Sequence, residues 1–422
     1  MLQLIRHRLV KNTAALMVVQ VAGYVAPFLV LPYLARILSK EHFGLIAYAT
    51  AFNQYFMVLV DYGFNLTATR RIAINRDDPE KISQIYSSVI AAKALLTLLG
   101  VVILFTVVLA TPKLRPNLPI FCISYLAVIG DLLFPMWLFQ GLQKMENLVW
   151  RDLLARLVSL GMMFAFVHKD GDYLWAAGFQ AGSMLLAGII GLITVPLLTP
   201  ARFVVPSRTE IFGALREGWP VFLSMAALSM SWATNVLILG LRSGPEDVAY
   251  YSASFRLITA ARMLVTPIVT ALYPHISHMA VASGQNAVAF LRKYALILAA
   301  PFLAGSLILF VGAPLIIHIV YSAKYDPSIL LLRIMAFSPF LLVFQMMYST
   351  FYMLAFGYEK EWSRIIMQST VLNFVVLIPL MFSIWPPAAV SITGVVVDIF
   401  AASATYRFFR KTTAAAPAMV TA

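Results

Sequence analysis

The chain has 422 residues, of which 61% are hydrophobic and 12% are charged, and its mean hydropathy is +0.86. Soluble domains carry about 25% charged residues, so the composition excludes a soluble globular protein and indicates a chain that resides in a lipid bilayer. The net charge is +13, but the basic residues are scattered in small groups at the ends of apolar runs, whereas nucleic-acid binding needs a clustered basic surface. We therefore expect no nucleic-acid partner.

Apolar runs long enough to cross a membrane recur along almost the whole chain. A hydrocarbon core about 30 Å thick is crossed by about 20 helical residues, and backbone groups at that depth must bond internally. We predict an all-α polytopic membrane protein with about twelve transmembrane helices. The expected spans are 12–38, 42–67, 83–110, 118–140, 152–168, 174–198, 219–241, 249–275, 294–320, 329–355, 366–384 and 389–408.

The basic residues predict the orientation of these spans. Arg6, Arg8 and Lys11 precede an apolar stretch that runs to Leu38, too long for a signal peptide and without a convincing cleavage site. We interpret this stretch as the first span. Cytoplasmic loops retain Lys and Arg, and about two-thirds of the 31 basic residues fall on the side of the N-terminus. Both termini are therefore expected in the cytoplasm.

The longest polar break, residues 199–218, leaves six expected spans on either side. AYATAF at 47–52 and YYSASF at 250–255 open the second and eighth spans, which indicates a duplication. Since each half has an even number of spans, the halves would be parallel repeats about a pseudo-two-fold axis along the membrane normal. We expect an N-terminal six-helix lobe at 1–200, a cytoplasmic connector at 201–218, and a C-terminal six-helix lobe at 219–422 with a short cytoplasmic tail.

Ionisable side chains inside spans usually face a water-filled cavity or a partner. Gln54, Asp61 and Asn65 lie on one helical stripe of the second span. The structural alternatives are an ion pair between Asp61 and Lys93, and side chains that reach the headgroups from helix ends. The expected polar cavity or coupling residues are Gln54, Asp61, Asn65 and Asp398, and the expected substrate-binding cations are Lys93, Arg256, Arg262 and Arg333.

Arg256 and Arg262 make the strongest case for a cationic cavity. They lie in one span on different faces, and no acidic residue within that span can neutralise them. Guanidinium groups bind phosphate bidentately and stay charged when partly desolvated. The pattern therefore favours a phosphorylated headgroup as the ligand.

Three segments resemble a known family. They are LPYLARILSKEHFGLIAYATAFNQYFMVLVDYGFNLTATRRIA at 31–73, NRDDPEKISQIYSSVIAAK at 75–93 and FPMWLFQGLQKM at 134–145. They resemble the Wzx-type O-antigen and repeat-unit flippases, the polysaccharide-biosynthesis members of the multidrug/oligosaccharidyl-lipid/polysaccharide exporter superfamily. In the second half the resemblance rests on the span count and on the YYSASF segment.

The resemblance implies a twelve-span protein of the bacterial inner membrane, with two six-helix lobes around a cationic central cavity. Such a protein would move an undecaprenyl-pyrophosphate-linked oligosaccharide from the cytoplasmic to the periplasmic leaflet by alternating access. Gln54, Asn65 and Tyr62 would contact the sugar. Its partners would be this lipid-linked oligosaccharide, membrane lipids, a polysaccharide polymerase with its chain-length machinery, and a coupling proton or sodium ion acting through Asp61 or Asp398.

Two alternatives stay open. A multidrug exporter of the same superfamily would share the fold, although cationic drugs call for exposed acidic groups. A membrane-embedded O-antigen polymerase or ligase would need catalytic groups on a long outer loop, and the expected outer loops are short. No catalytic motif is evident, His275 and His278 lack an HExxH frame, and Cys122 is the single cysteine. We expect no enzyme activity, no cofactor and no metal site.

Overall fold

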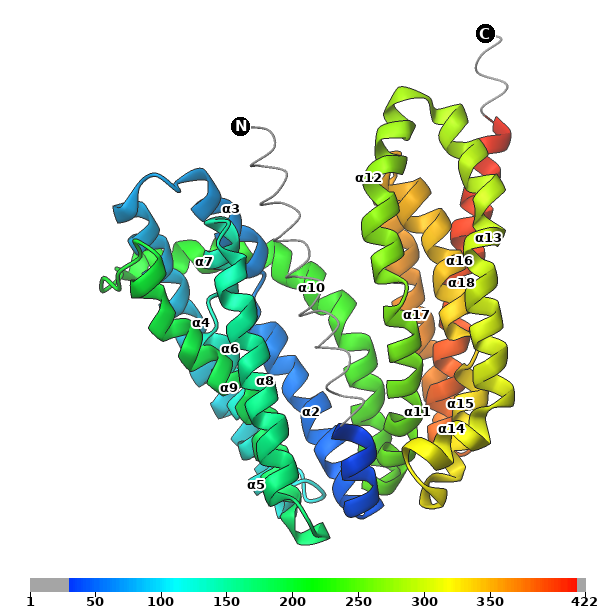
Figure 1. Ribbon diagram of the computed structural model, residues 1–422, viewed down its shortest axis with the longest axis horizontal. Helices are drawn as coiled ribbons and strands as arrows, with labels where there is room; N and C mark the ends of the chain where they lie inside the picture. Colours follow the sequence, from blue (N-terminus) through cyan, green and yellow to red (C-terminus); the bar gives the residue numbers. More distant parts are fainter. Residues whose placement is uncertain (1–29, 416–422) are drawn as a thin grey trace. The chain divides into compact units, whose positions relative to one another are not determined.

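The computed structural model describes residues 30–415, and over that range its regular structure is helical (Figure 1). The chain divides into two compact units, Met1–Leu237 and Ile238–Ala422, with the division inside helix α10, Arg208–Ser243. Of the predicted connector, residues 201–207 are non-helical and the remainder belongs to α10. The lobes at 1–200 and 219–422 stay a prediction.

The first unit begins, within the described residues, with a short helical stretch at 30–37. Ser39 then caps the next helix by accepting a hydrogen bond from the backbone N–H of His42. The helices are α2 (Lys40–Asp61), α3 (Phe64–Ile74), α4 (Pro79–Ala110), α5 (Leu118–Ser124), α6 (Leu126–Leu133), α7 (Met136–Gly141), α8 (Met145–Phe166), α9 (Tyr173–Leu198) and α10, with 3₁₀ turns at Arg115–Asn117 and Asp170–Asp172.

Helix α4 starts where the sequence carries a strong N-terminal signal. Asp78 accepts a hydrogen bond from the backbone N–H of Lys81, and Pro79 occupies the first turn. That hydrogen bond lowers the pKa of the exposed Asp78 carboxyl, because it favours the charged form.

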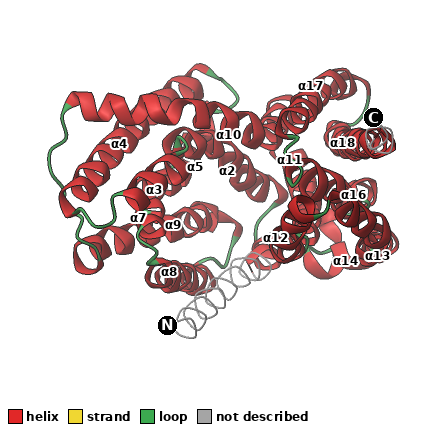
Figure 2. Cartoon of the chain, turned by 90° about the horizontal axis from the view of Figure 1, so that it is seen from above, coloured by secondary structure: helices red, strands yellow, loops and turns green. Residues whose placement is uncertain are grey.

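The second unit consists of the end of α10 and eight further helices (Figure 2). They are α11 (Pro245–Met263), α12 (Thr266–Ala282), α13 (Gly284–Val311), α14 (Ala313–Val320), α15 (Pro327–Met335), α16 (Ser338–Tyr348), α17 (Glu359–Ser383) and α18 (Pro386–Ala415), with a 3₁₀ turn at Ala323–Tyr325 and a π-helical turn at Ser349–Leu354. Helix α18 packs against α16 and α17.

Helices cover the predicted spans that lie in the described residues, whereas most of the first, 12–38, lies outside them. Nine helices of the described part are long and apolar enough to cross a membrane. Helices α8 and α10 cover two more expected spans, 152–168 and 219–241, whose membrane crossing stays a prediction. The total of twelve and the pseudo-two-fold axis stay predictions as well.

Proline interrupts several of these spans. Pro135 separates α6 from α7, α12 starts just before Pro267, and α16 starts just before Pro339. Proline lacks the N–H that a continuous helix needs, and its ring clashes with the preceding turn. Pro274, in contrast, lies inside α12 without ending it.

Apolar side chains face outward as well as inward. On α4, Leu98 and Val102 are 65% and 62% exposed, while Leu104 and Val108 on the other side are buried. A helix that is apolar all round is stable only when both sides avoid water. The protein is therefore a multi-pass membrane protein whose outer surface meets lipid.

Glycines allow two helices of the first unit to pack closely. A Cβ on Gly130 of α6 would lie 2.4 Å from the backbone of Met184 in α9, and one on Gly188 would lie 2.4 Å from the carbonyl oxygen of Gly130. Small residues let membrane helices approach to backbone contact. At these two glycines α6 and α9 pack backbone against backbone.

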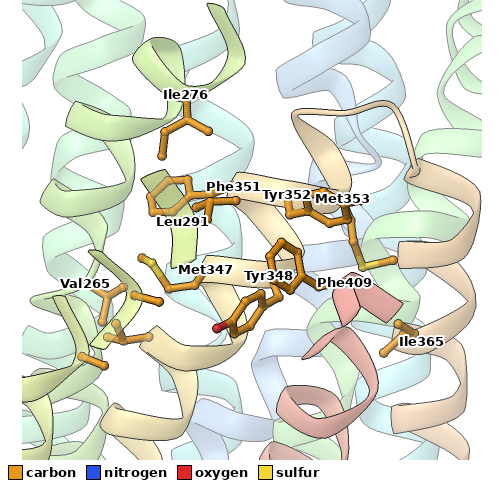
Figure 3. Close-up of a cluster of buried hydrophobic side chains, with 13 residues drawn as sticks. Val265, Ile276, Leu291, Met347, Tyr348, Phe351, Tyr352, Met353, Ile365 and Phe409 are labelled. Carbon is orange, nitrogen blue, oxygen red and sulfur yellow. The ribbon is translucent and has the colours of Figure 1, made fainter. Parts of the chain in front are cut away.

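One apolar core of the second unit is rich in aromatic and methionine side chains (Figure 3). Met347, Tyr348 and Phe351 contribute from α16 and the π-helical turn, and Phe409 contributes from α18. Tyr348 and Phe409 have ring centroids 4.9 Å apart. The core ties the end of α18 to the middle of the unit.

Candidate functional site

The first unit contains a buried ion pair between α4 and α6. The ammonium of Lys93, which is 2% exposed, lies 3.0 Å from Oδ2 of Asp131 and donates to the Asp131 carbonyl oxygen at 2.8 Å. In a continuous helix that carbonyl would accept from residue 135, but Pro135 has no N–H. At the proline break that carbonyl accepts from the Phe134 N–H at 3.3 Å, and it also accepts from the Lys93 ammonium, which gives the buried lysine a second partner.

Asp61, on α2, is close to this pair but is held by a different partner. The Asn65 side-chain amide donates to Oδ1 of Asp61 at 2.5 Å, and Asp61 interacts electrostatically with both Asp131 and Lys93. The alternative that Asp61 and Lys93 form an ion pair is therefore wrong, because the carboxylate that pairs with Lys93 is that of Asp131. The three charged groups form one buried cluster.

The other polar residues expected near this stripe lie in different surroundings. Gln54 is partly buried, and its side chain forms no hydrogen bond within residues 30–415. Tyr62 is 8% exposed and stacks on Phe222 of α10, with ring centroids 4.8 Å apart. The Tyr62 ring face therefore packs against protein.

Sequence reasoning missed Asn53, the neighbour of Gln54. Its side chain is 3% exposed, and neither amide atom has a hydrogen-bond partner in the described part of the protein. A buried amide without partners costs free energy. Asn53 is a neutral residue within an apolar run, so no local feature of the sequence indicates that its side chain is buried without partners.

The second unit contains a corresponding ion pair between α11 and α18. The Arg262 guanidinium lies 3.0 Å from Oδ1 of Asp398, and the hydroxyl of Ser338 on α16 donates to Oδ2. Helix α11 ends at Met263, directly after the arginine. Three helices thus meet at one carboxylate, and Arg262 is neutralised from another helix.

Arg256, six residues earlier on α11, has no such partner among the described residues. It is partly buried, and no carboxylate of residues 30–415 lies within ion-pair distance of it. The phenol of Tyr321 is close enough to interact with it electrostatically. A buried cation without a counter-ion is costly, so Arg256 is the cation best placed to accept an anionic ligand.

Arg333 lies apart from these groups at the surface of the second unit. It is exposed, its guanidinium carbon is 5.9 Å from the Phe310 ring centroid, and its Nε donates to the Phe310 carbonyl oxygen at 3.3 Å. The four predicted cations therefore occupy three environments. Lys93 and Arg262 are paired, Arg333 is exposed, and Arg256 is partly buried without a carboxylate.

No group of three metal-ligating side chains that could hold a metal ion occurs in the described range, 30–415. Cys122 is partly exposed and has no disulfide partner there.

The fold defines the class of protein. Among solved structures, the chain is similar to one described as the lipid II flippase MurJ in an inward closed conformation, with a TM-score of 0.71, 14% identity, and coverage of 93% of this chain and 87% of that one. It is also similar to an inward-facing multidrug resistance MATE family transporter of the MOP superfamily, with a TM-score of 0.63, 16% identity, and coverage of 93% and 98%. Likeness at these identities shows an all-α polytopic membrane fold.

Sequence comparison is more specific. Residues 9–280 match the model of the family described as polysaccharide biosynthesis protein. The chain is 34% identical over 370 residues to the "Putative O-antigen transporter" of Escherichia coli (strain K12), covering 88% of this chain and 89% of the relative. It is 32% identical over 375 residues to the protein of the same name from Shigella dysenteriae, covering 88% and 93%.

The chain therefore belongs to the polysaccharide biosynthesis protein family. The resemblance read from its sequence is confirmed. Both relatives are named as transporters rather than as enzymes, which agrees with the expectation that this chain is not an enzyme.

Proposed function

We propose that the protein is a flippase that moves an undecaprenyl-pyrophosphate-linked oligosaccharide, an O-antigen or exopolysaccharide repeat unit, between membrane leaflets. Transfer runs from the cytoplasmic to the periplasmic leaflet of the bacterial inner membrane, by alternating access. Family membership and the two O-antigen transporter relatives support the class of cargo. Both termini face the cytoplasm in this proposal.

The observation that carries the mechanism is Arg256. It is a cation within a span, without a carboxylate among the described residues, and a pyrophosphate offers oxygens that a guanidinium binds bidentately. Arg262 and Lys93 already have carboxylate partners. In this proposal Arg256 contacts the pyrophosphate first, and Arg262 joins when its bond to Asp398 opens.

Asp398 and Asp61 are the proposed coupling groups. Protonation of Asp398, or sodium binding there, would weaken its hold on Arg262, because a neutralised carboxyl no longer attracts the guanidinium. Gln54 and Asn65 are the proposed sugar contacts. A polymerase and its chain-length machinery would receive the cargo on the periplasmic side.

The multidrug exporter alternative rests on likeness of fold alone. A cationic drug would be repelled by Arg256, since like charges in a low-dielectric setting repel strongly. The polymerase or ligase alternative would lengthen or transfer the sugar, whereas a flippase moves it unchanged.

The test is leaflet transfer of a fluorescent undecaprenyl-pyrophosphate oligosaccharide in proteoliposomes. We expect Arg256→Ala to lower the transfer rate by about tenfold or more, because a charged hydrogen bond is worth about 1.5–3 kcal/mol. Arg256→Lys should retain part of the rate, because it keeps the charge and loses the bidentate geometry. The amount of folded protein should be unchanged in both variants.

Arg333→Ala is the matched control, since it removes an exposed arginine from the same unit. We expect it to transport normally. Normal transport by Arg256→Ala, or equal loss in the Arg333 control, would contradict the proposed role of Arg256. Lengthened sugar in the products would contradict the flippase itself.

A further inference from the structure

An open groove runs along one face of α17 in the second unit, with α18 contributing Phe400. Its volume is about 880 Å³. None of its residues belongs to the charged clusters described above. The groove therefore has no role in the proposed transport mechanism.

The groove is basic at one end of α17 and apolar farther along the helix. Lys360, Ser363 and Arg364 lie at one end, Met367 and Gln368 follow, and Val371, Leu372 and Val375 line the remainder. A basic and polar end followed by apolar surface matches the order of headgroup and acyl chain in a phospholipid.

The two cations at the end of the groove are available for a ligand. Both are exposed, and within the described residues neither forms an ion pair. They share this end of the unit with the last turns of α18, because Tyr358 and Phe408 have ring centroids 5.1 Å apart. The end is basic overall and carries Arg292, Lys293, Lys360, Arg364, Arg407, Arg410 and Lys411.

The dimensions also fit a lipid. A helix rises 1.5 Å per residue, so Arg364 and Val375 are separated by about 16 Å along the axis. One leaflet of a hydrocarbon core about 30 Å thick is about 15 Å deep. A phosphate held at Lys360 and Arg364 would place its acyl chain along the apolar part of the groove.

We propose that this groove is a binding site for one anionic glycerophospholipid of the leaflet that borders the basic end of the unit. Lys360 and Arg364 bind the phosphate and its anionic headgroup, Ser363 and Gln368 reach the ester oxygens, and the acyl chain lies on Met367, Val371 and Val375. The site recognises net negative charge, so a zwitterionic phospholipid with the same chains binds more weakly.

The experiment measures retained lipid by native mass spectrometry of the full-length protein, titrated with phosphatidylglycerol or with phosphatidylcholine of identical chains. We expect tighter binding of phosphatidylglycerol. Lys360→Gln/Arg364→Gln should weaken that binding about 25-fold, or about fivefold for each basic residue near the surface. Val371→Trp, at an exposed position, should weaken binding of both lipids by filling the groove.

Arg407→Gln/Arg410→Gln is the matched control, because it removes two charges from the same end of the unit outside this groove. It should leave the affinity for phosphatidylglycerol within about twofold. Equal losses in the two double variants would mean general attraction to a basic surface and would overturn the site. Equal affinity for the two lipids would also overturn the site. So would a Val371→Trp variant that binds both lipids as tightly as the unchanged protein.

Discussion

Three of the predicted cations in the described residues are partly or fully buried, and two of these are paired with carboxylates while the third is an exception. Lys93 is matched by Asp131, and Arg262 by Asp398 with help from Ser338. Arg256 lacks a carboxylate within the described residues. Since desolvation penalises every unpaired ion in a membrane, the exception is the group on which a functional role can be tested most directly.

The Lys93–Asp131 pair gives a prediction at the same scale. Lys93→Met keeps the side-chain length and leaves the Asp131 carboxylate without its cation. We expect the free energy of unfolding to fall by about 3 kcal/mol, because breaking a buried pair strands a charge. A denaturant titration of both proteins in mixed micelles measures this change in the free energy of unfolding.

Lys93→Met/Asp131→Leu is the control for this prediction, because it removes both charges. We expect the double variant to recover most of the lost stability, since apolar replacement of a buried pair is often neutral. A double variant as unstable as Lys93→Met alone would show that packing, and not the charge, caused the loss.

Among the helices, α6 and α9 approach to backbone contact at two glycines. Gly130 and Gly188 leave no room for a methyl group, whereas Gly182, also on α9, has no neighbour within 4 Å of the corresponding position. Two glycines on one helix therefore have different roles.

This contrast predicts opposite effects of the same substitution. Gly188→Ala should lower the free energy of unfolding by about 2 kcal/mol, because overpacking forces the backbones apart. Gly182→Ala should be neutral or slightly stabilising, since alanine favours the helix. Thermal unfolding in detergent, followed by circular dichroism, compares them, and equal shifts in both variants would contradict close packing of α6 and α9.

At the scale of the whole molecule, the positive-inside pattern predicts the side of each loop. Arg76 precedes α4 and Lys113 follows it, and both residues are exposed. The helix between them has 32 residues, more than the roughly 20 needed to cross the bilayer. The two residues should therefore lie on opposite sides.

A thiol-labelling experiment tests this. In a Cys122→Ser background, Arg76→Cys should react with a membrane-impermeant maleimide only after the inner membrane is opened. Lys113→Cys should react in spheroplasts with an intact membrane, because its loop is expected in the periplasm. The reverse labelling pattern would invert the topology and place both termini outside.

The sequence located the helices well because the signal is local. Helices cover each predicted span within the described residues, in some spans as two or more helices with a short break, and the caps at Ser39 and Asp78 set the starts of α2 and α4. The breaks near Pro267 and Pro339 also follow from one residue type. For the site, the sequence identified ionisable residues in spans but not their partners, so the alternative it offered for Lys93 was a pair with Asp61, and it left Arg262 unneutralised.

The sequence by itself determined the class of protein, the helices and the set of charged candidates, because apolar run length and charge cost in lipid depend on a residue and its near neighbours. Tertiary structure decided which candidates are neutralised. Asp131 and Asp398 reach their cations from other helices, so partners far apart in the chain meet only after packing. The same packing left Arg256 without a carboxylate among the described residues and formed the groove along α17.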